Sequence, residues 1–251
     1  MLLTVLVLGV MTTLLVYVNA SSREVQKRMD LDNGIASQRL DQAAAMLKLA
    51  YHELAGTMDS TASAPVTAAQ LLDIAGVPDE WHLRLQIGSR RQQTPLAWRN
   101  LYVWSPPTEH PDTTTYDATT DTFTPDPDAR WRVVDGRQIQ ERFIEDTAAR
   151  LQKIGHGLKE RFFVLTELDP LHDPTVNRFQ QGVVNGGYIT LAAMGMAQAI
   201  GLSAEDQKDA WGGTILASNT VDCNTVAPPY DMVLRSVAPW GTVIDLRVVQ
   251  P

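Results

Sequence analysis

The sequence predicts an α+β protein: a long N-terminal membrane-spanning α-helix packed on an antiparallel β-sheet head domain, with a second long helix. Three observations predict it. The first 18 residues, Met1 to Val18, contain no charged side chain. A helical pattern without proline then continues to about Met58. Toward the C-terminus, apolar and polar residues alternate in segments separated by turn residues, which is typical of antiparallel strands.

The charge-free segment at the start of the chain is almost long enough to cross a membrane. At about 1.5 Å per residue it would span about 27 Å as a helix, against about 30 Å for the hydrocarbon core of a bilayer. A cleavable secretory signal begins with basic residues and ends at a small-residue cleavage site. No basic residue precedes this run, and Val18-Asn19-Ala20 is a poor cleavage site. We therefore expect a membrane segment that belongs to the working protein.

The basic residues nearest to this segment conflict with an orientation that puts the rest of the chain outside the cytoplasm. Arg23, Lys27 and Arg28 all follow it, and basic flanks usually stay in the cytoplasm, which would keep the bulk of the chain there. The conflict disappears under the hypothesis that a basic leader once preceded Met1 and was removed. N-terminal sequencing of the native protein that finds Met1 as the translated start would contradict this hypothesis.

Residues 20–58 continue as a predicted amphipathic helix, with a weak point at Asp30, Asn33 and Gly34. Apolar residues recur there at spacings of three and four, so they form one stripe that can pack on a sheet. The stripe consists of Leu40, Ala43, Ala44, Leu47, Tyr51 and Leu54.

The remaining sequence divides into an inserted strand and loop region, residues 59–135, and a helix followed by a C-terminal antiparallel sheet, residues 136–251. The second long helix is predicted over Arg137 to Val164, with Gly155 and Gly157 weakening its middle. The other predicted elements are short helices over 67–75 and 189–200, and strands over 81–87, 98–104, 131–134, 214–218, 230–237 and 242–249.

Composition and motifs argue against several classes of function. The formal net charge is -8, whereas a nucleic-acid partner usually requires a clustered basic face. The single cysteine, Cys223, can form no internal disulfide and no cysteine-rich metal site. The sequence contains no HExxH, CxxC, GxSxG or phosphate-loop pattern. We therefore expect no enzyme activity, no cofactor and no nucleic-acid partner.

A long loop rich in proline, threonine and aspartate, Ser105 to Ala129, is the predicted exposed, function-bearing surface. Carboxylates in such a loop are hard oxygen ligands that can hold Ca²⁺, but their spacing does not match an EF-hand. We favour a solvated loop over a metal site. Its metal candidates are Asp121, Asp126 and Asp128, which follow Asp112 and Asp117 in the same loop.

Two stretches resemble type IV pilins and pseudopilins. MLLTVLVLGVM is similar to the start of mature subunits of the toxin-coregulated and bundle-forming class, and this resemblance extends to about Met58. Lys208 to Ile215 resembles the family's Asp-Pro-Trp-Gly turn into a strand, with Ala210 where proline often lies, within a looser resemblance over 182–251. The chain departs from the family at Thr4 and Val5, where a glutamate is usual, and in lacking a C-terminal disulfide loop.

The resemblance implies a structural subunit of a type IV pilus-like extracellular filament, a helical homo-polymer of identical or homologous pilin subunits. The unassembled subunit would lie in the bacterial inner membrane and be handled by the pilus assembly machinery. Met1 would be the processed and N-methylated residue, and Leu40, Ala44, Leu47, Tyr51 and Leu54 would pack the helix on the sheet. The filament core and membrane residues would be Leu2, Leu3, Val5, Leu6, Val7, Leu8, Val10, Leu14, Leu15 and Val16.

Two alternatives remain open. One is a single-span inner-membrane assembly or scaffold protein of a pilus or secretion system that does not polymerise. The other is a membrane-anchored enzyme, which the lack of a nucleophile or metal motif disfavours. The resemblance leaves open whether the subunit is major or minor, and whether the filament serves adhesion, conjugation, DNA uptake, motility or secretion.

Overall fold

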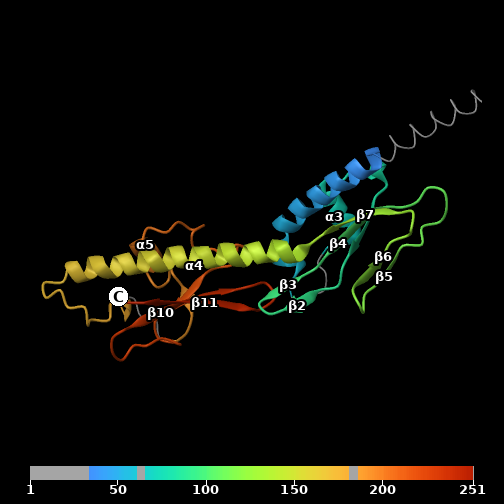
Figure 1. Cartoon of the computed structure of the whole chain (residues 1–251). Helices are drawn as coiled ribbons and strands as arrows, with labels where there is room; N and C mark the ends of the chain where they lie inside the picture. Colours follow the sequence, from blue (N-terminus) through green and yellow to red (C-terminus); the bar gives the residue numbers. More distant parts are fainter. Residues whose placement is uncertain (1–33, 61–65, 181–185, 251) are drawn as a thin grey trace, which may run out of the picture.

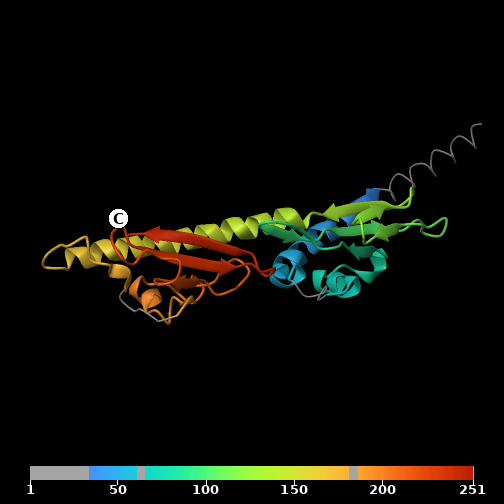
Figure 2. The ribbon, with the colours of Figure 1, turned by 90° about the horizontal axis from the view of Figure 1, so that it is seen from below.

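The computed structural model describes residues 34–60, 66–180 and 186–250. These residues form an elongated molecule in which two units, each a helix packed on an antiparallel sheet, follow one another along the long axis (Figure 1). We call residues 34–135 the first unit and residues 136–250 the second unit. The first unit, in blue to green, forms one end of the molecule, and the second unit, in yellow to red, forms the other (Figure 2).

The first unit is built on a helix over residues 34–53 and a three-stranded sheet in the order β1-β4-β7. Two hairpins, β2-β3 and β5-β6, form separate two-stranded sheets. The bounds are α2 Ala55–Met58, α3 Ala68–Ala75, η1 Asp79–Trp81, β1 Arg84–Ile87, β2 Arg91–Gln93, β3 Leu96–Trp98, β4 Leu101–Ser105, β5 Thr115–Asp117, β6 Thr122–Thr124 and β7 Arg130–Val134.

The long helix of the first unit packs through one face of its surface. Leu40, Leu47 and Tyr51 are completely buried in the core cluster that includes the central strand β4, and Ala44 and Leu54 are partly buried against it. Residues at spacings of three and four lie on one side of a helix, so the sequence pattern by itself brings these side chains to the sheet.

The second unit is built on α4, a helix of 32 residues whose first turn is capped by the carboxylate of Asp135. It packs on a four-stranded sheet in the order β11-β10-β9-β8. The bounds are α4 Gly136–Glu167, η2 Arg178–Gln180, β8 Ile189–Thr190, α5 Met196–Ala199, β9 Leu216–Ser218, β10 Asp231–Val237 and β11 Val243–Val249.

A packed junction joins the two units. Trp240, in the turn between β10 and β11, donates its indole N–H to the carbonyl of Pro95 in the turn between β2 and β3, at 2.9 Å. Ala97, Ala238 and Trp240 form a small buried cluster between these turns. The last β-hairpin of the chain therefore contacts an early hairpin of the first unit.

The fold prediction is partly wrong. The chain is α+β with antiparallel sheets, as predicted, but the predicted membrane-spanning helix is not found. Within residues 34–60, 66–180 and 186–250, no helix combines the length and apolarity needed to cross a bilayer. The helix over 34–53 and α4 both carry charged residues on their exposed faces, because each buries only one side against a sheet. The predicted filament core and membrane residues and Met1 lie outside the described residues.

Two local predictions also differ from the structure. Gly155 was predicted to weaken α4, but the helix is continuous through it. The strand β11 packs closely on the helix at this position, since a Cβ at Gly155 would lie 3.1 Å from Val248 and 3.2 Å from Leu246. The helix predicted over 189–200 is instead the short strand β8 followed by the four-residue α5. The first two residues of this segment pair with β9 at the edge of the sheet. The local sequence pattern does not indicate this pairing.

Candidate functional site

The loop from Ser105 to Ala129 is folded around an aromatic side chain. Phe123 of β6 stacks on Tyr102, with ring centroids 4.7 Å apart, and also contacts Trp104 and Trp131. These contacts attach the β5-β6 hairpin to the strands β4 and β7, on either side of the loop. A segment with the composition of a solvated loop is thus held at a defined position.

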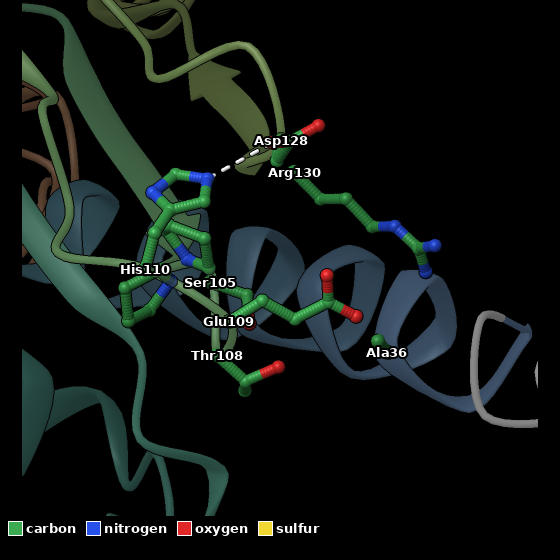
Figure 3. Close-up of a pocket in the computed structure, with 9 residues that line it drawn as sticks. Ala36, Ser105, Thr108, Glu109, His110, Asp128 and Arg130 are labelled. Carbon is green, nitrogen blue, oxygen red and sulfur yellow. Dashed lines mark hydrogen bonds and ion pairs between the residues drawn. The ribbon is translucent and has the colours of Figure 1, made fainter.

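A pocket of about 500 Å³ lies where this loop meets the helix over 34–53 (Figure 3). Its walls combine the backbone of two prolines with acidic, basic and hydroxyl side chains. Figure 3 shows the imidazole of His110 turned toward Asp128, while Glu109 and Arg130 extend along the helix that carries Ala36. The lining residues are Ala36, Ser105, Pro106, Pro107, Thr108, Glu109, His110, Asp128 and Arg130.

At the edge of this pocket, one histidine faces two carboxylates. His110 Nε2 lies 2.9 Å from Asp128 Oδ2 and 3.7 Å from Asp126 Oδ1. One ligand atom from each of the three residues lies within 4.8 Å of the others. Imidazole nitrogen with carboxylate oxygen is a common ligand set for divalent metal ions in proteins.

Asp126 is the anchored member of this group. Its side chain is buried, and Oδ2 accepts hydrogen bonds from the backbone N–H and the hydroxyl of Thr113, at 3.0 and 2.5 Å. Oδ1 accepts from the backbone N–H of Asp128 at 2.9 Å. The Thr113 hydroxyl and these N–H groups hold the pKa of Asp126 below its ordinary value, so its carboxylate is charged at neutral pH.

His110 is held from its other side. Its Nδ1 lies 2.9 Å from the carbonyl oxygen of Pro111, which can only accept a hydrogen bond, so Nδ1 carries a proton. The Pro111 carbonyl and then Asp128 raise the pKa of His110. Nε2 donates to Asp128 Oδ2 at 2.9 Å in the ion pair, because a carboxylate oxygen can only accept. Since Nδ1 is held by Pro111, Nε2 is the nitrogen whose proton a cation could replace.

The structure separates the other aspartates of the loop from this group. Asp121 is paired with Arg91 and accepts hydrogen bonds from the hydroxyl of Tyr116 at 2.6 Å and the backbone N–H of Ser89 at 3.0 Å. Asp112 accepts from the indole N–H of Trp104 at 3.0 Å. Of the predicted metal candidates, Asp126 and Asp128 come together, and Asp121 serves a different contact.

His110 was not singled out as a ligand from the sequence. It precedes Asp126 by 16 residues, and the two are brought together because β4 and β7 are neighbours in one sheet, so the ends of the loop meet. The only signal in the sequence was a histidine at the start of a loop that contains several aspartates.

A second polar group is buried at the junction between the units. The carboxylate of Asp59 is completely buried and accepts hydrogen bonds from the hydroxyl of Tyr51 and from Gln140 Nε2, the latter at 2.6 Å. Gln140 Oε1 in turn accepts from the indole N–H of Trp211 at 2.8 Å. Burial raises the pKa of Asp59 from its ordinary 3.8 to about 6, although Tyr51 and Gln140 partly oppose this effect.

The turn that resembles the pilin motif supplies Trp211 to this junction. Asp209 is buried and accepts from the backbone N–H of Gly213 at 2.7 Å and from the hydroxyl of Ser236 at 2.7 Å. The Trp211 ring, 5.9 Å from Phe143 and 5.3 Å from Trp240 between centroids, fills the junction. The motif is thus a structural turn that fixes an aromatic side chain.

Comparisons of the chain with protein-family models, with curated proteins and with solved structures gave no match. The junction is closed, since Tyr51 and Gln140 bond to Asp59 Oδ2 and Trp211 bonds to Gln140, while the buried Asp59 Oδ1 accepts no hydrogen bond from the described residues. The group at His110 is accessible, since Asp128 is mostly exposed and borders the pocket.

Proposed function

We propose that the chain is a structural, noncatalytic subunit of a type IV pilus-like extracellular filament, assembled with identical or homologous subunits through its apolar N-terminal segment. One observation carries this proposal. The charge-free run Met1 to Val18 is followed by a helix, residues 34–53, that is fastened to an antiparallel sheet by a continuous apolar stripe. In the sequence, an apolar run thus precedes a firmly packed folded body, which supports assembly through the N-terminal segment.

The physical basis is the burial of apolar surface between neighbouring subunits. Apolar surface removed from water contributes about 25 cal/mol per Å², so a run of 18 residues without charge favours packing with copies of itself. Such packing along a helical path is heterologous and extends without closing. Before assembly the subunit would lie at the bacterial inner membrane, with the pilus assembly machinery as its partner.

The arrangement of the two units supports an outward-facing role for the second unit. The first unit, which contains the helix over 34–53, lies at one end of the elongated molecule and the second unit at the other (Figure 2). The junction contacts of Trp240, Gln140 and Trp211 fix the units to each other. A subunit held in a filament by its N-terminal segment would present the second unit away from that segment.

Electron microscopy of fibres sheared from cells, with mass spectrometry of their subunits, tests this proposal. We expect the protein in the fibres, with Met1 as its processed and N-methylated first residue. A Leu6→Asp variant should be lost from fibres, because a charge in the apolar segment disrupts its packing. Val226→Asp is the matched control, since Val226 is 90% exposed in the second unit and should not affect assembly. Finding the protein only in membranes, with no fibres, would contradict the proposal.

A further inference from the structure

We propose that His110, Asp126 and Asp128 form a binding site for a divalent transition metal ion, with Zn²⁺ as the ion that best suits the ligand set. The site lies at the edge of the pocket between the loop 105–129 and the helix over 34–53. It is independent of the proposed role in a filament, since it needs only the folded first unit.

The distances between the ligand atoms fit such an ion. With metal–ligand bonds of about 2.0–2.2 Å, neighbouring ligand atoms of a tetrahedral zinc site lie about 3.3–3.6 Å apart. The distances from His110 Nε2 to the two carboxylates, 2.9 and 3.7 Å, lie on either side of this range. The three ligand atoms lie within 4.8 Å of one another, so rotation of the exposed Asp128 side chain and a small shift of His110 would bring them onto one ion.

Two of the three ligands are already oriented. The bond from His110 Nδ1 to the Pro111 carbonyl is the usual second contact of a metal-binding histidine. It leaves Nε2 to bind the ion, which would displace the proton that Nε2 donates to Asp128. Asp126 is anchored by Thr113 through two hydrogen bonds to Oδ2, so that Oδ1 is directed at His110. Ion binding therefore has to order chiefly the exposed side chain of Asp128.

Charge and chemistry select the ion. Two carboxylates and a neutral imidazole carry a charge of minus two, which a divalent cation neutralises. Because one ligand is an imidazole nitrogen, the set favours Zn²⁺ over Ca²⁺ and Mg²⁺, which prefer oxygen ligands. His110 and Asp128 both line the pocket, so a fourth coordination position would face it and be filled by water.

The effect of binding follows from where the ligands lie in the chain. His110 follows β4 and the two aspartates precede β7, so one ion would connect the two ends of the loop. Because the unfolded chain does not hold these ligands together, the ion would stabilise the folded first unit. We infer a structural metal that fixes the loop and the shape of the pocket.

Binding of Zn²⁺ to the purified, metal-free full chain near pH 7.5 tests the site. Calorimetry should show one equivalent bound at micromolar ion, and Zn²⁺ should raise the melting temperature reversibly on addition of a chelator. His110→Ala and Asp128→Asn should each weaken binding at least about tenfold. His172→Ala is the matched control, because His172 is also an exposed loop histidine beside a carboxylate, that of Glu167.

Co²⁺ provides a second readout that does not depend on stability. Bound at the site, it should give a visible absorption spectrum characteristic of nitrogen and oxygen ligands, and His110→Ala should abolish that spectrum. The circular dichroism spectrum of each variant shows that it is folded. Absence of Zn²⁺ binding by the wild type, or equal binding by wild type and His110→Ala, would show that His110 only forms ion pairs with the two aspartates.

Discussion

In the first unit the helix-sheet interface ends in the buried carboxyl group of Asp59. In the second unit α4 packs on its sheet through the apolar side chains of Leu151, Ile154 and Leu158. Tyr51 and Asp59, at the end of the first interface, bond to Gln140 at the start of α4. The first unit thus depends on the second to satisfy its polar groups. The interface between the units combines these hydrogen bonds with the apolar contacts of Trp211 and Trp240, whereas α4 meets its own sheet through apolar packing.

The largest expected effect is at Gly136, where the units meet. A Cβ there would lie 2.0 Å from the backbone oxygen of Arg99 and 2.6 Å from the hydroxyl of Tyr51. Since the backbone cannot give way as a flexible side chain does, Gly136→Ala should lower the free energy of unfolding by more than about 3 kcal/mol. Chemical denaturation of the wild type and the variant measures this difference in the free energy of unfolding. Gly34→Ala is the control, because a Cβ there meets no atom within 4 Å; equal stability of the two variants would contradict this account of the junction.

The next effect is a dependence of stability on pH through Asp59. The pKa of Asp59 is raised to about 6 in the fold, so the folded protein holds this proton more tightly than the unfolded chain does. Its contribution to stability is therefore complete below about pH 4 and is lost as the pH rises through about 6. The shift of about two units corresponds to on the order of 3 kcal/mol.

Asp59→Asn isolates this contribution. An amide oxygen can accept from Tyr51 and Gln140 without a charge, so the variant should lose most of the fall in stability between pH 4 and pH 7 that Asp59 causes. Denaturant unfolding of both proteins at several pH values measures the difference. If the two curves stay parallel across this range, then Asp59 does not titrate in the fold as described.

The smallest expected effect compares two glycines of α4. A Cβ at Gly155 would be 3.1–3.2 Å from side chains of β11, whereas at Gly157 it would be 3.5 Å from Ile200, an ordinary contact. Alanine favours a helix over glycine by about 1 kcal/mol, so Gly157→Ala should stabilise the protein by up to that amount. Gly155→Ala should gain less, because crowding against β11 offsets the helical preference. Thermal unfolding ranks the two, and the reverse order would show that β11 does not pack closely on α4.

The sequence predicted the parts of this fold whose signals are local. The stripe from Leu40 to Leu54, the extent of α4 and the strands β10 and β11 follow from spacings of three and four or of two. Shorter elements were less well predicted, because β8 and α5 are set by the neighbouring strand β9 and by turns. The prediction of a membrane-spanning helix was wrong for the described residues, where every long helix has a polar face.

The candidate site likewise combines residues that local sequence indicates with contacts that only the fold creates. From the sequence, Asp121, Asp126 and Asp128 were candidates for one group of oxygen ligands, and no pattern of residues separated them. The structure assigns Asp121 to Arg91 and brings His110 to the other two, because ligands far apart in sequence meet only through strand pairing. The burial of Asp59 was likewise not predictable from the sequence, since nothing in its neighbouring residues indicates that Tyr51 and Gln140 bond to it.

By itself, the sequence determined which segments form amphipathic helices and strands, because side-chain periodicity fixes which face of an element is apolar. Only the tertiary structure decided that two helix-sheet units share a junction through Trp211 and Gln140, and that His110 faces two carboxylates. Contacts of this second kind depend on the relative positions of distant segments. Those positions are set by packing of whole elements, and no local pattern of residues encodes them.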